Sequence, residues 1–212
     1  MNWFTSDQHF NHENIIKYCS RPFESLGAMN AAIIERWNET VRDEDTVYVV
    51  GDVFLGDAGA GAGIVRKLRG KKVLIKGNHD RSHRTMLESG FDEVWQRKSI
   101  ELLDGRKALL CHKPLPESVI NHVDLQVHGH RHSGPIVSGK RVNVCVDLWN
   151  YRPVSEEEII GLRLGSPRTD YVSVEVTAEF VKVTASVRKE DYEGLLDHLQ
   201  GYSRTIWDIR EE

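Results

Sequence analysis

The sequence predicts an α/β protein in which two β-sheets pack together and helices cover them. Short apolar runs with strand periodicity alternate with helical patterns through the first half of the chain. In the second half, successive strand-type runs predict antiparallel pairing. Five of the apolar runs end at a turn that carries a side chain able to bind metal. A chain with this order of elements is typical of two packed sheets with helices outside.

Composition and charge narrow the class of protein. With 40% apolar and 28% charged residues in 212 positions, the chain is an ordinary globular protein, neither disordered nor fibrous. Its net charge of −4 argues against a protein that coats nucleic acid. The three cysteines form no disulfide framework or CxxC site, no apolar run is long enough to cross a membrane, and the first strand leaves no space for a signal peptide. We therefore expect a cytoplasmic protein without a membrane partner.

The first half of the chain predicts three strands and three helices. Strands are expected at residues 3–6, 46–50 and 72–76, and helices at residues 11–18 and 27–40. The second helix places Met29, Ile33, Ile34 and Trp37 on one apolar face. Residues 56–63 are rich in glycine but lack the spacing of a phosphate-binding loop, so a flexible loop is predicted there, followed by a helix at residues 64–69.

The second half predicts a hairpin, three further strands and two helices, of which the last is capped. A short helix is expected at residues 84–89 and strands at 93–96, 99–103 and 107–111, with Asp104 and Gly105 forming a two-residue hairpin turn between the last two. Strands at residues 125–128 and 141–146 follow. The last helix, at residues 155–162, begins with the capping-box pair Ser155 and Glu158.

A domain boundary is expected at residues 165–167, where Gly, Ser and Pro follow one another. Residues 1–165 form the main domain. Residues 166–212 form a small appendage, with a hairpin at residues 171–177 and 180–187 and an amphipathic helix at residues 190–200. We find no chemistry of its own in this appendage.

The turns that follow the apolar runs carry the side chains that bind divalent transition metals. In chain order these side chains, with two neighbours in the same turns, are Asp7, His9, Asp52, Asn78, His79, Asp80, His112, His130 and His132. In an open α/β sheet the carboxyl ends of the strands face one crevice, so these turns can meet there. We predict a two-metal hydrolytic site in which Asp52 is the bridge, because its carboxylate has two oxygens to divide between the ions.

At these residues the sequence resembles the calcineurin-like metallophosphoesterase superfamily. The blocks Asp7-Gln8-His9, Gly51-Asp52, Gly77-Asn78-His79-Asp80, His112 and Gly129-His130-Arg131-His132 occur in that superfamily's order, over about residues 1–162. Residues 5–10 and 143–150 look like a small bacterial and phage subgroup. The resemblance implies an αββα sandwich of two mixed β-sheets flanked by helices, with residues 1–165 as the catalytic domain. It also implies one metal held by Asp7, His9, Asp52 and His132, and a second held by Asp52, Asn78, His112 and His130.

The function implied by the resemblance is a phosphodiesterase of small nucleotides, including cyclic ones, that uses a hydroxide bridging two metal ions. Manganese is the first choice of metal, with iron, zinc or nickel as alternatives. By resemblance, His79 contacts the phosphate or protonates the leaving oxygen, and Asp80 fixes the tautomer of His79. His12 and Arg131 are candidates for binding the substrate. The protein phosphatases of this superfamily carry the motif GDxxDRG. Here Gly51 and Asp52 are followed by Val, Phe, Leu and Gly, without the second aspartate and the arginine, which argues against protein phosphatase activity.

Two other functions remain open, a phosphomonoesterase with the same site and an inactive scaffold. The scaffold ranks last because no ligand block is broken. The intervals between blocks are too short for a cap domain, which favours an open site that accepts diesters. No extended basic groove for nucleic acid is evident, and no oligomeric state is indicated. Arg21, Arg81 and Arg131 could each grip phosphate, but each alone is interpreted as a surface charge.

Overall fold

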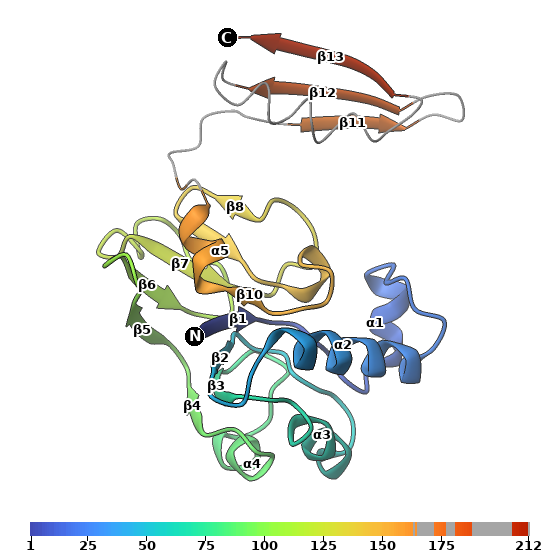
Figure 1. Ribbon diagram of the computed structural model, residues 1–212, viewed down its shortest axis with the longest axis vertical. Helices are drawn as coiled ribbons and strands as arrows, with labels where there is room; N and C mark the ends of the chain where they lie inside the picture. Colours follow the sequence, from blue (N-terminus) through green and yellow to red (C-terminus); the bar gives the residue numbers. More distant parts are fainter. Residues whose placement is uncertain (163, 165–171, 177–180, 188–204, 212) are drawn as a thin grey trace. The chain divides into compact units, whose positions relative to one another are not determined.

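The computed structural model describes residues 1–162, 164, 172–176, 181–187 and 205–211 (Figure 1). The chain divides into two compact units, Met1–Leu164 and Gly165–Glu212. The expected boundary at residues 165–167 and the expected helix at residues 190–200 lie outside the described residues. None of the described helices is both long and apolar enough to cross a membrane.

The first sheet of the larger unit has five strands in the order β10-β1-β2-β3-β4. Its four parallel strands are β1 (Asn2–Thr5), β2 (Thr46–Val49), β3 (Lys71–Ile75) and β4 (Glu93–Trp95). The short strand β10 (Val154–Ser155) pairs antiparallel with β1 at the edge. Since the first four strands run the same way, the turns that follow them all lie at one edge of this sheet.

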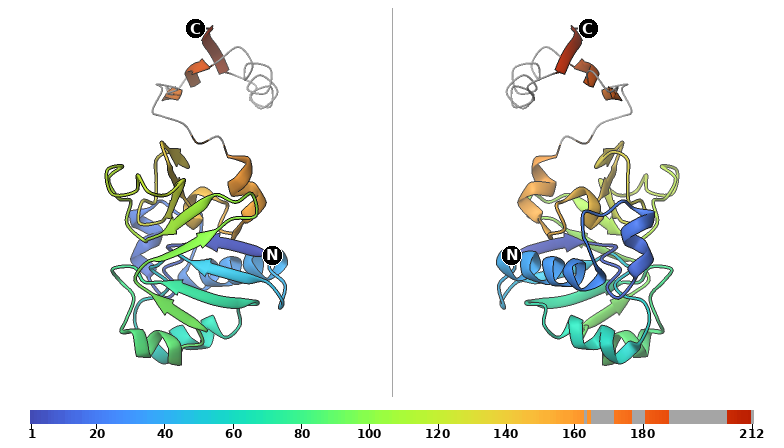
Figure 2. Two further views of the ribbon diagram at one scale, coloured as in Figure 1. Left: turned by 90° about the vertical axis from the view of Figure 1, so that its left-hand side faces the viewer. Right: turned by 90° about the vertical axis from the view of Figure 1, so that its right-hand side faces the viewer.

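The second sheet also has five strands, in the order β5-β6-β7-β9-β8. Parallel strands β6 (Lys107–Leu110), β7 (Leu125–His128) and β9 (Arg141–Asn143) form its middle. Antiparallel strands β5 (Lys98–Glu101) and β8 (Val137–Ser138) form its edges. Two mixed sheets with flanking helices confirm the predicted fold class. Both sheets can be followed in the side views of Figure 2.

Helices α2 (Leu26–Thr40) and α3 (Ala58–Val65) cover the outer face of the first sheet. Met29, Ile33 and Trp37 of α2 are buried in one cluster with residues of β2 and β3, as the predicted apolar face requires, and Ile34 packs at its margin. Two shorter helices, α1 (Glu13–Tyr18) and α4 (His83–Glu88), each contribute one residue to this cluster. Burial of this apolar surface is the main favourable term that holds the helices on the sheet.

A second cluster fills the space between the two sheets. Phe4, Val73 and Ile75 of the first sheet pack there with Leu110 and Val127 of the second. Helix α5 (Glu156–Gly161) adds Ile159, and its first turn is closed by the predicted Ser155–Glu158 capping box. On the second sheet Leu109 packs against Ile120 and Val123 of residues 114–124, a segment without helix or strand.

In the smaller unit, β11 (Val172–Val176) and β12 (Val181–Val187) pair antiparallel where a hairpin was expected. A third strand, β13 (Thr205–Glu211), pairs parallel with β12 and was not predicted.

Several predicted boundaries need correction. The hairpin between β5 and β6 has three loop residues, not two, because Leu102 donates its backbone N–H to the Arg106 carbonyl at 2.9 Å and so extends the ladder. The strand expected at residues 141–146 ends at Asn143, and a 3-10 helix, η1 (Val146–Leu148), follows. Strands β8 and β10 were missed because two residues are too few to show a periodicity.

The glycine-rich segment forms helix α3 rather than the predicted flexible loop. This helix ends at Val65, so the helix expected at residues 64–69 does not extend beyond that residue. The Asp57 side chain caps α3 by accepting the Ala60 N–H at 2.8 Å. Gly61 is buried, and a Cβ atom there would overlap the ring of Phe54. Close packing on Phe54 therefore stabilises a helix that the composition alone disfavours.

Two substitutions in α3 test this explanation. Gly61→Ala should lower the free energy of unfolding by about 1–3 kcal/mol, because the added methyl group displaces the Phe54 ring. Gly63→Ala is the matched control: a Cβ there meets no atom within 4 Å, so the better helix former should raise stability by about 0.5–1 kcal/mol. Urea unfolding of both variants measures the difference. Equal effects would contradict the packing explanation.

Candidate metal centre

The ends of the two sheets are joined where the predicted metal-binding turns lie. Asp7 donates its backbone N–H to the Gly51 carbonyl at 2.9 Å, which ties the turn after β1 to the turn after β2. Ser6 forms an isolated bridge with Cys145, beyond the end of β9 in the other sheet. These backbone contacts bring turns from both sheets into one crevice.

The first group of candidate ligands contains Asp7, His9 and His132, whose ligating atoms all lie within 4.8 Å of one another. Asp7 Oδ1 is 4.0 Å from His9 Nε2 and 3.8 Å from His132 Nε2. The other oxygen, Oδ2, accepts the Ser6 hydroxyl at 2.6 Å and the His130 N–H at 2.9 Å. One oxygen of Asp7 is thus held by the protein while the other faces the two imidazoles.

The second group contains Asp52, His112 and His130. Asn78 joins it, because its Oδ1 atom is 3.2 Å from His112 Nε2. His112 donates its Nδ1–H to the Val50 carbonyl at 2.8 Å, which directs Nε2 toward Asp52. Asn78 and His130 are exposed whereas Asp52 and His112 are buried, so this group lies at the surface end of the crevice.

Asp52 connects the two groups through a single oxygen. Its Oδ2 atom is 3.7 Å from His9 Nε2 and 3.4 Å from His112 Nε2. Its Oδ1 atom instead accepts the backbone N–H of His79 at 2.9 Å. Among the described residues, one oxygen of Asp52, and not both as expected, faces the imidazoles of the two groups.

The unpaired atoms of the first group fit a divalent cation. Asp7 Oδ1 and both ring nitrogens of His9 are buried and lack a hydrogen-bond partner among the described residues. Such atoms cost free energy unless something binds them, and carboxylate oxygen with imidazole nitrogen is a common ligand set for transition metals. Asp7 Oδ1 and His132 Nε2 are 3.8 Å apart, so both atoms could bind one cation.

The pKa shifts of His9 and Asp52 also favour metal binding. Burial lowers the pKa of His9 to about 3, which keeps the imidazole neutral and able to act as a ligand. Burial would raise the pKa of Asp52, but the hydrogen bond and charge of His112 and the His79 N–H lower it to about 2. Burial raises the pKa of Asp7, and a cation bound to this carboxylate would lower the pKa again, because a positive charge favours the ionised form.

His132 is hydrogen-bonded to a buried ion pair formed by Asp147 and Arg21. His132 Nδ1 is 2.8 Å from Asp147 Oδ2, and Arg21 donates to both oxygens of Asp147 at 2.8 Å. Arg21 also donates to the backbone carbonyls of Gln8 and Asp7 at 2.9 and 2.8 Å. Burial would raise the pKa of Asp147, but His132 and Arg21 lower it to about 2.

Sequence reasoning missed both members of this pair. The side chain of Arg21 has an exposed fraction of 0%, so its interpretation as a surface charge is wrong. Asp147 received no role, although it follows a strand at the same edge as the predicted ligands, which is the signal that could have identified it. A third grouping, of Cys19, His132 and Asp147, shares its atoms with this network and adjoins Arg21, so it is not a separate cation site.

Strained backbone accompanies the site. Asp7, His9, Asp52 and His130 have φ angles of 60°, 50°, 58° and 69°, in the left-handed region that side chains avoid. Non-glycine residues there can each cost about 1–3 kcal/mol and persist where the surroundings enforce them, often at functional sites. A Cβ at Gly129 would overlap Asp7 Oδ2, so glycine is required for this close approach.

His79 and Asp80 have different surroundings. The His79 ring is exposed, with Nε2 4.0 Å from Asp52 Oδ2 and its centroid 5.6 Å from that of His9. The Asp80 carboxylate accepts the backbone N–H groups of Asp52, Val53 and Gly77 at 2.8–2.9 Å. The expected bond from Asp80 to His79 is therefore corrected: Asp80 holds the turn that carries Asp52.

The two residues expected to bind substrate differ in their surroundings. His12 is beside His9, with ring centroids 5.4 Å apart, and its Nδ1 atom is buried without a partner among the described residues. Arg131 is exposed, and its side chain forms no hydrogen bond or ion pair within the described part of the chain. Arg81 donates a hydrogen bond to the Gly56 carbonyl.

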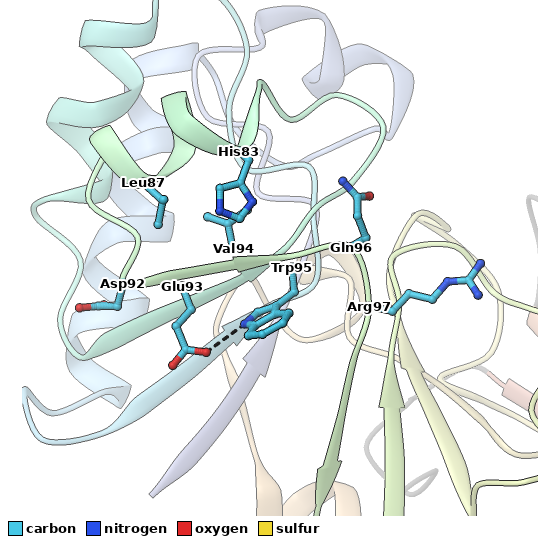
Figure 3. A pocket seen from close by; sticks show the side chains of 8 residues that line it. All are labelled: His83, Leu87, Asp92, Glu93, Val94, Trp95, Gln96 and Arg97. Atoms are coloured by element: carbon cyan, nitrogen blue, oxygen red, sulfur yellow. Dashed lines mark hydrogen bonds between the residues drawn. The ribbon is translucent and has the colours of Figure 1, made fainter.

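A hollow of about 790 Å³ lies apart from these groups, at the edge strand β4 (Figure 3). Its lining includes Trp95, which donates its ring N–H to Glu93 at 2.9 Å. None of the candidate metal ligands lines it.

The support of His132 by Asp147 can be tested without any assay of catalysis. Asp147→Asn keeps the size of the side chain but removes the charge that orients the imidazole, so affinity for Mn²⁺ should fall about 10- to 100-fold. Calorimetric titration of the full chain measures this change. Asp43→Asn, at an exposed carboxylate with no ion pair among the described residues, is the control. Unchanged affinity in Asp147→Asn would remove the assigned role.

Comparison with known proteins shows relatives of this chain. No family model matches the chain. The uncharacterized protein MJ1445 of Methanocaldococcus jannaschii is 38% identical over 169 residues, which cover 76% of this chain and 89% of that protein. Gene 66 protein of Mycobacterium phage L5 is 28% identical over 193 residues, covering 76% of this chain and 92% of its own.

Two solved structures are also similar. The protein of unknown function AQ665 from Aquifex aeolicus has a TM-score of 0.63 and 31% identity, over 77% of this chain and 99% of its own. An archaeal phosphodiesterase has a TM-score of 0.40 and 18% identity, over 68% of this chain and 81% of its own. The identity and coverage of MJ1445 show that this chain belongs to the same family as that protein.

Proposed function

We propose that this protein is a phosphoesterase that depends on two divalent metal ions and favours diesters of small nucleotides, including cyclic ones. The observation that carries the proposal is the position of Asp52 Oδ2, within 3.7 Å of imidazole nitrogens from both candidate groups. A carboxylate shared in this way is what a pair of ions about 3.5–4 Å apart requires.

Each ion would have four ligands from this chain. Asp7, His9, Asp52 and His132 would hold one, and Asp52, Asn78, His112 and His130 the other. When bound, such ions lower the pKa of water from about 15.7 toward 7, on the order of 10 kcal/mol toward a nucleophile at neutral pH, and offset charge on the phosphoryl oxygens. Imidazole, carboxylate and amide ligands suit manganese, which we take as the first choice, with iron, zinc and nickel as alternatives.

His79 is the residue best placed to act on the substrate itself. Its backbone N–H is bonded to Asp52 Oδ1 at 2.9 Å, so the main chain that carries the exposed ring is held beside the shared carboxylate. From there it can contact a phosphoryl oxygen or donate a proton to the leaving oxygen. His12, beside His9, and the exposed Arg131 are further candidates for contact with the phosphate.

The exposed side of the site favours a diester. Asn78, His79 and His130 are all exposed, which leaves room for a second ester substituent. A phosphomonoesterase would use the same ligands and is the alternative. An inactive scaffold is the least favoured, because nothing in its function requires unpaired, buried ligand atoms such as Asp7 Oδ1.

The direct test is hydrolysis of two chromogenic esters. The purified chain should cleave bis(p-nitrophenyl) phosphate with added Mn²⁺, and a chelator should abolish the activity because the nucleophile then lacks its activating charge. The monoester p-nitrophenyl phosphate is the comparison substrate. Much faster turnover of the monoester would favour the alternative function. No turnover of either ester with any of the four metals would contradict the proposal.

Metal content separates the role of His79 from that of the ligands. His112→Ala should reduce bound metal and rate together, because it removes a ligand. His79→Ala should retain the metal and lower kcat by about 10²- to 10⁴-fold, the usual contribution of a proton donor in the transition state. Mass spectrometry of metal in the purified variants measures the first effect, and steady-state kinetics the second. Loss of both ions from His79→Ala would show that His79 is a ligand instead.

A further inference from the structure

A pocket of about 420 Å³ opens beside the second group of candidate ligands. It is lined by residues that follow β3, that connect β4 to β5 and that follow β6: Lys76, Gly77, Asn78, Gln96, Arg97, Cys111, His112, Lys113 and Leu115. Asn78 and His112 belong to both the pocket and the candidate metal centre. Its volume is within the range of small-ligand pockets, about 300–1,000 Å³.

The lining of this pocket is strongly positive. Lys76, Arg97 and Lys113 contribute three cationic side chains, and the lining contains no Asp or Glu. Within the described residues none of the three has a carboxylate at ion-pair distance, although other cations of this chain do. Lys113 is also among the charges that, after burial and His112, lower the pKa of His130.

Arg97 lines both this pocket and the larger hollow that contains Glu93. Figure 3 shows the Arg97 side chain directed away from Glu93 and Trp95. Glu93 already accepts hydrogen bonds from Lys71 at 2.8 Å and Lys98 at 3.0 Å. The charge of Arg97 is therefore not neutralised by Glu93.

Two of the three cations, Lys76 and Lys113, adjoin parts of the chain that hydrogen bonds hold in place. Lys76 directly follows β3 and donates its backbone N–H to the Trp95 carbonyl at 2.8 Å. Lys113 directly follows His112, which is fixed by its bond to the Val50 carbonyl. Like charges held close together repel one another, and an anion among them removes that repulsion while it accepts charge-assisted hydrogen bonds.

We propose that this pocket binds a second phosphoryl group of the substrate, so that the preferred substrates are small nucleotides with a phosphate in addition to the ester that is cleaved. This inference rests on the proposed function of the adjoining metal centre. An arginine and two lysines around one hollow match a phosphate dianion, and Leu115 offers an apolar wall for the sugar that links the two phosphates. A single hollow of this volume fits a small nucleotide better than a long strand.

Two substrates that differ only at the remote position test the proposal. They are thymidine 5′-(p-nitrophenyl phosphate) and the same compound with a 3′-phosphate. The full chain with Mn²⁺ should show about tenfold higher kcat/KM for the 3′-phosphorylated compound, mainly through a lower KM. Arg97→Gln and Lys113→Gln should each reduce this preference severalfold. Because the preference is a ratio within one protein, a partial loss of folded enzyme does not change it.

Lys67→Gln is the matched control, because Lys67 is exposed, outside the pocket and without an ion pair among the described residues. It should keep the full preference. If the wild-type chain hydrolysed both compounds with nearly equal kcat/KM, the proposal that this pocket binds phosphate would be contradicted. The proposed function would then remain intact.

A binding measurement separates the two hypotheses. In the presence of a chelator, calorimetry should show that the chain binds thymidine 3′,5′-bisphosphate about tenfold more tightly than thymidine 5′-monophosphate, and that Lys113→Gln loses this difference. Selective binding of the bisphosphate without hydrolysis of any ester would support the pocket and overturn the proposed function. Equal binding of the two nucleotides would overturn the pocket.

Discussion

The position of the Asp52 carboxylate is the constraint on which the candidate site depends. Its Oδ1 atom is held by the His79 N–H, and Asp80 binds the backbone of the turn that carries it. A Cβ at Gly77 would overlap Asp52 Oδ1, so the turn after β3 can approach Asp52 only because residue 77 is glycine. With Oδ1 occupied, Oδ2 is left to face imidazoles from both groups, and a single oxygen joins them.

Buried charges around this carboxylate support one another. Asp7 and Asp52 bring two carboxylates into the crevice, and Arg21 lies behind them, bonded to Asp147 and to the Asp7 carbonyl. Replacing a buried ion pair with apolar residues is often neutral or stabilising, whereas removing one partner costs about 3–5 kcal/mol. The pair of Arg21 and Asp147 is thus better explained by the orientation it gives His132 than by a net gain in stability.

The net charge of the chain, −4, does not describe the surface at the site. Lys76, Arg97 and Lys113 surround one hollow without an acidic residue in its lining, while acidic side chains elsewhere balance the total. An anionic substrate responds to the local field and not to the sum over the molecule. A chain that is acidic overall can therefore present a cationic pocket next to a candidate metal centre.

The sequence by itself determined the fold class and the residues that meet at the site, because strand periodicity and the side chain after each strand are local properties. Only the tertiary structure decided the features that depend on distant partners. Arg21 meets Asp147 across 126 positions, and Asp80 meets the backbone of Asp52 across 28. The glycine-rich helix depends on Phe54, outside the helix itself. No local pattern encodes such contacts, since each exists only after the chain has folded.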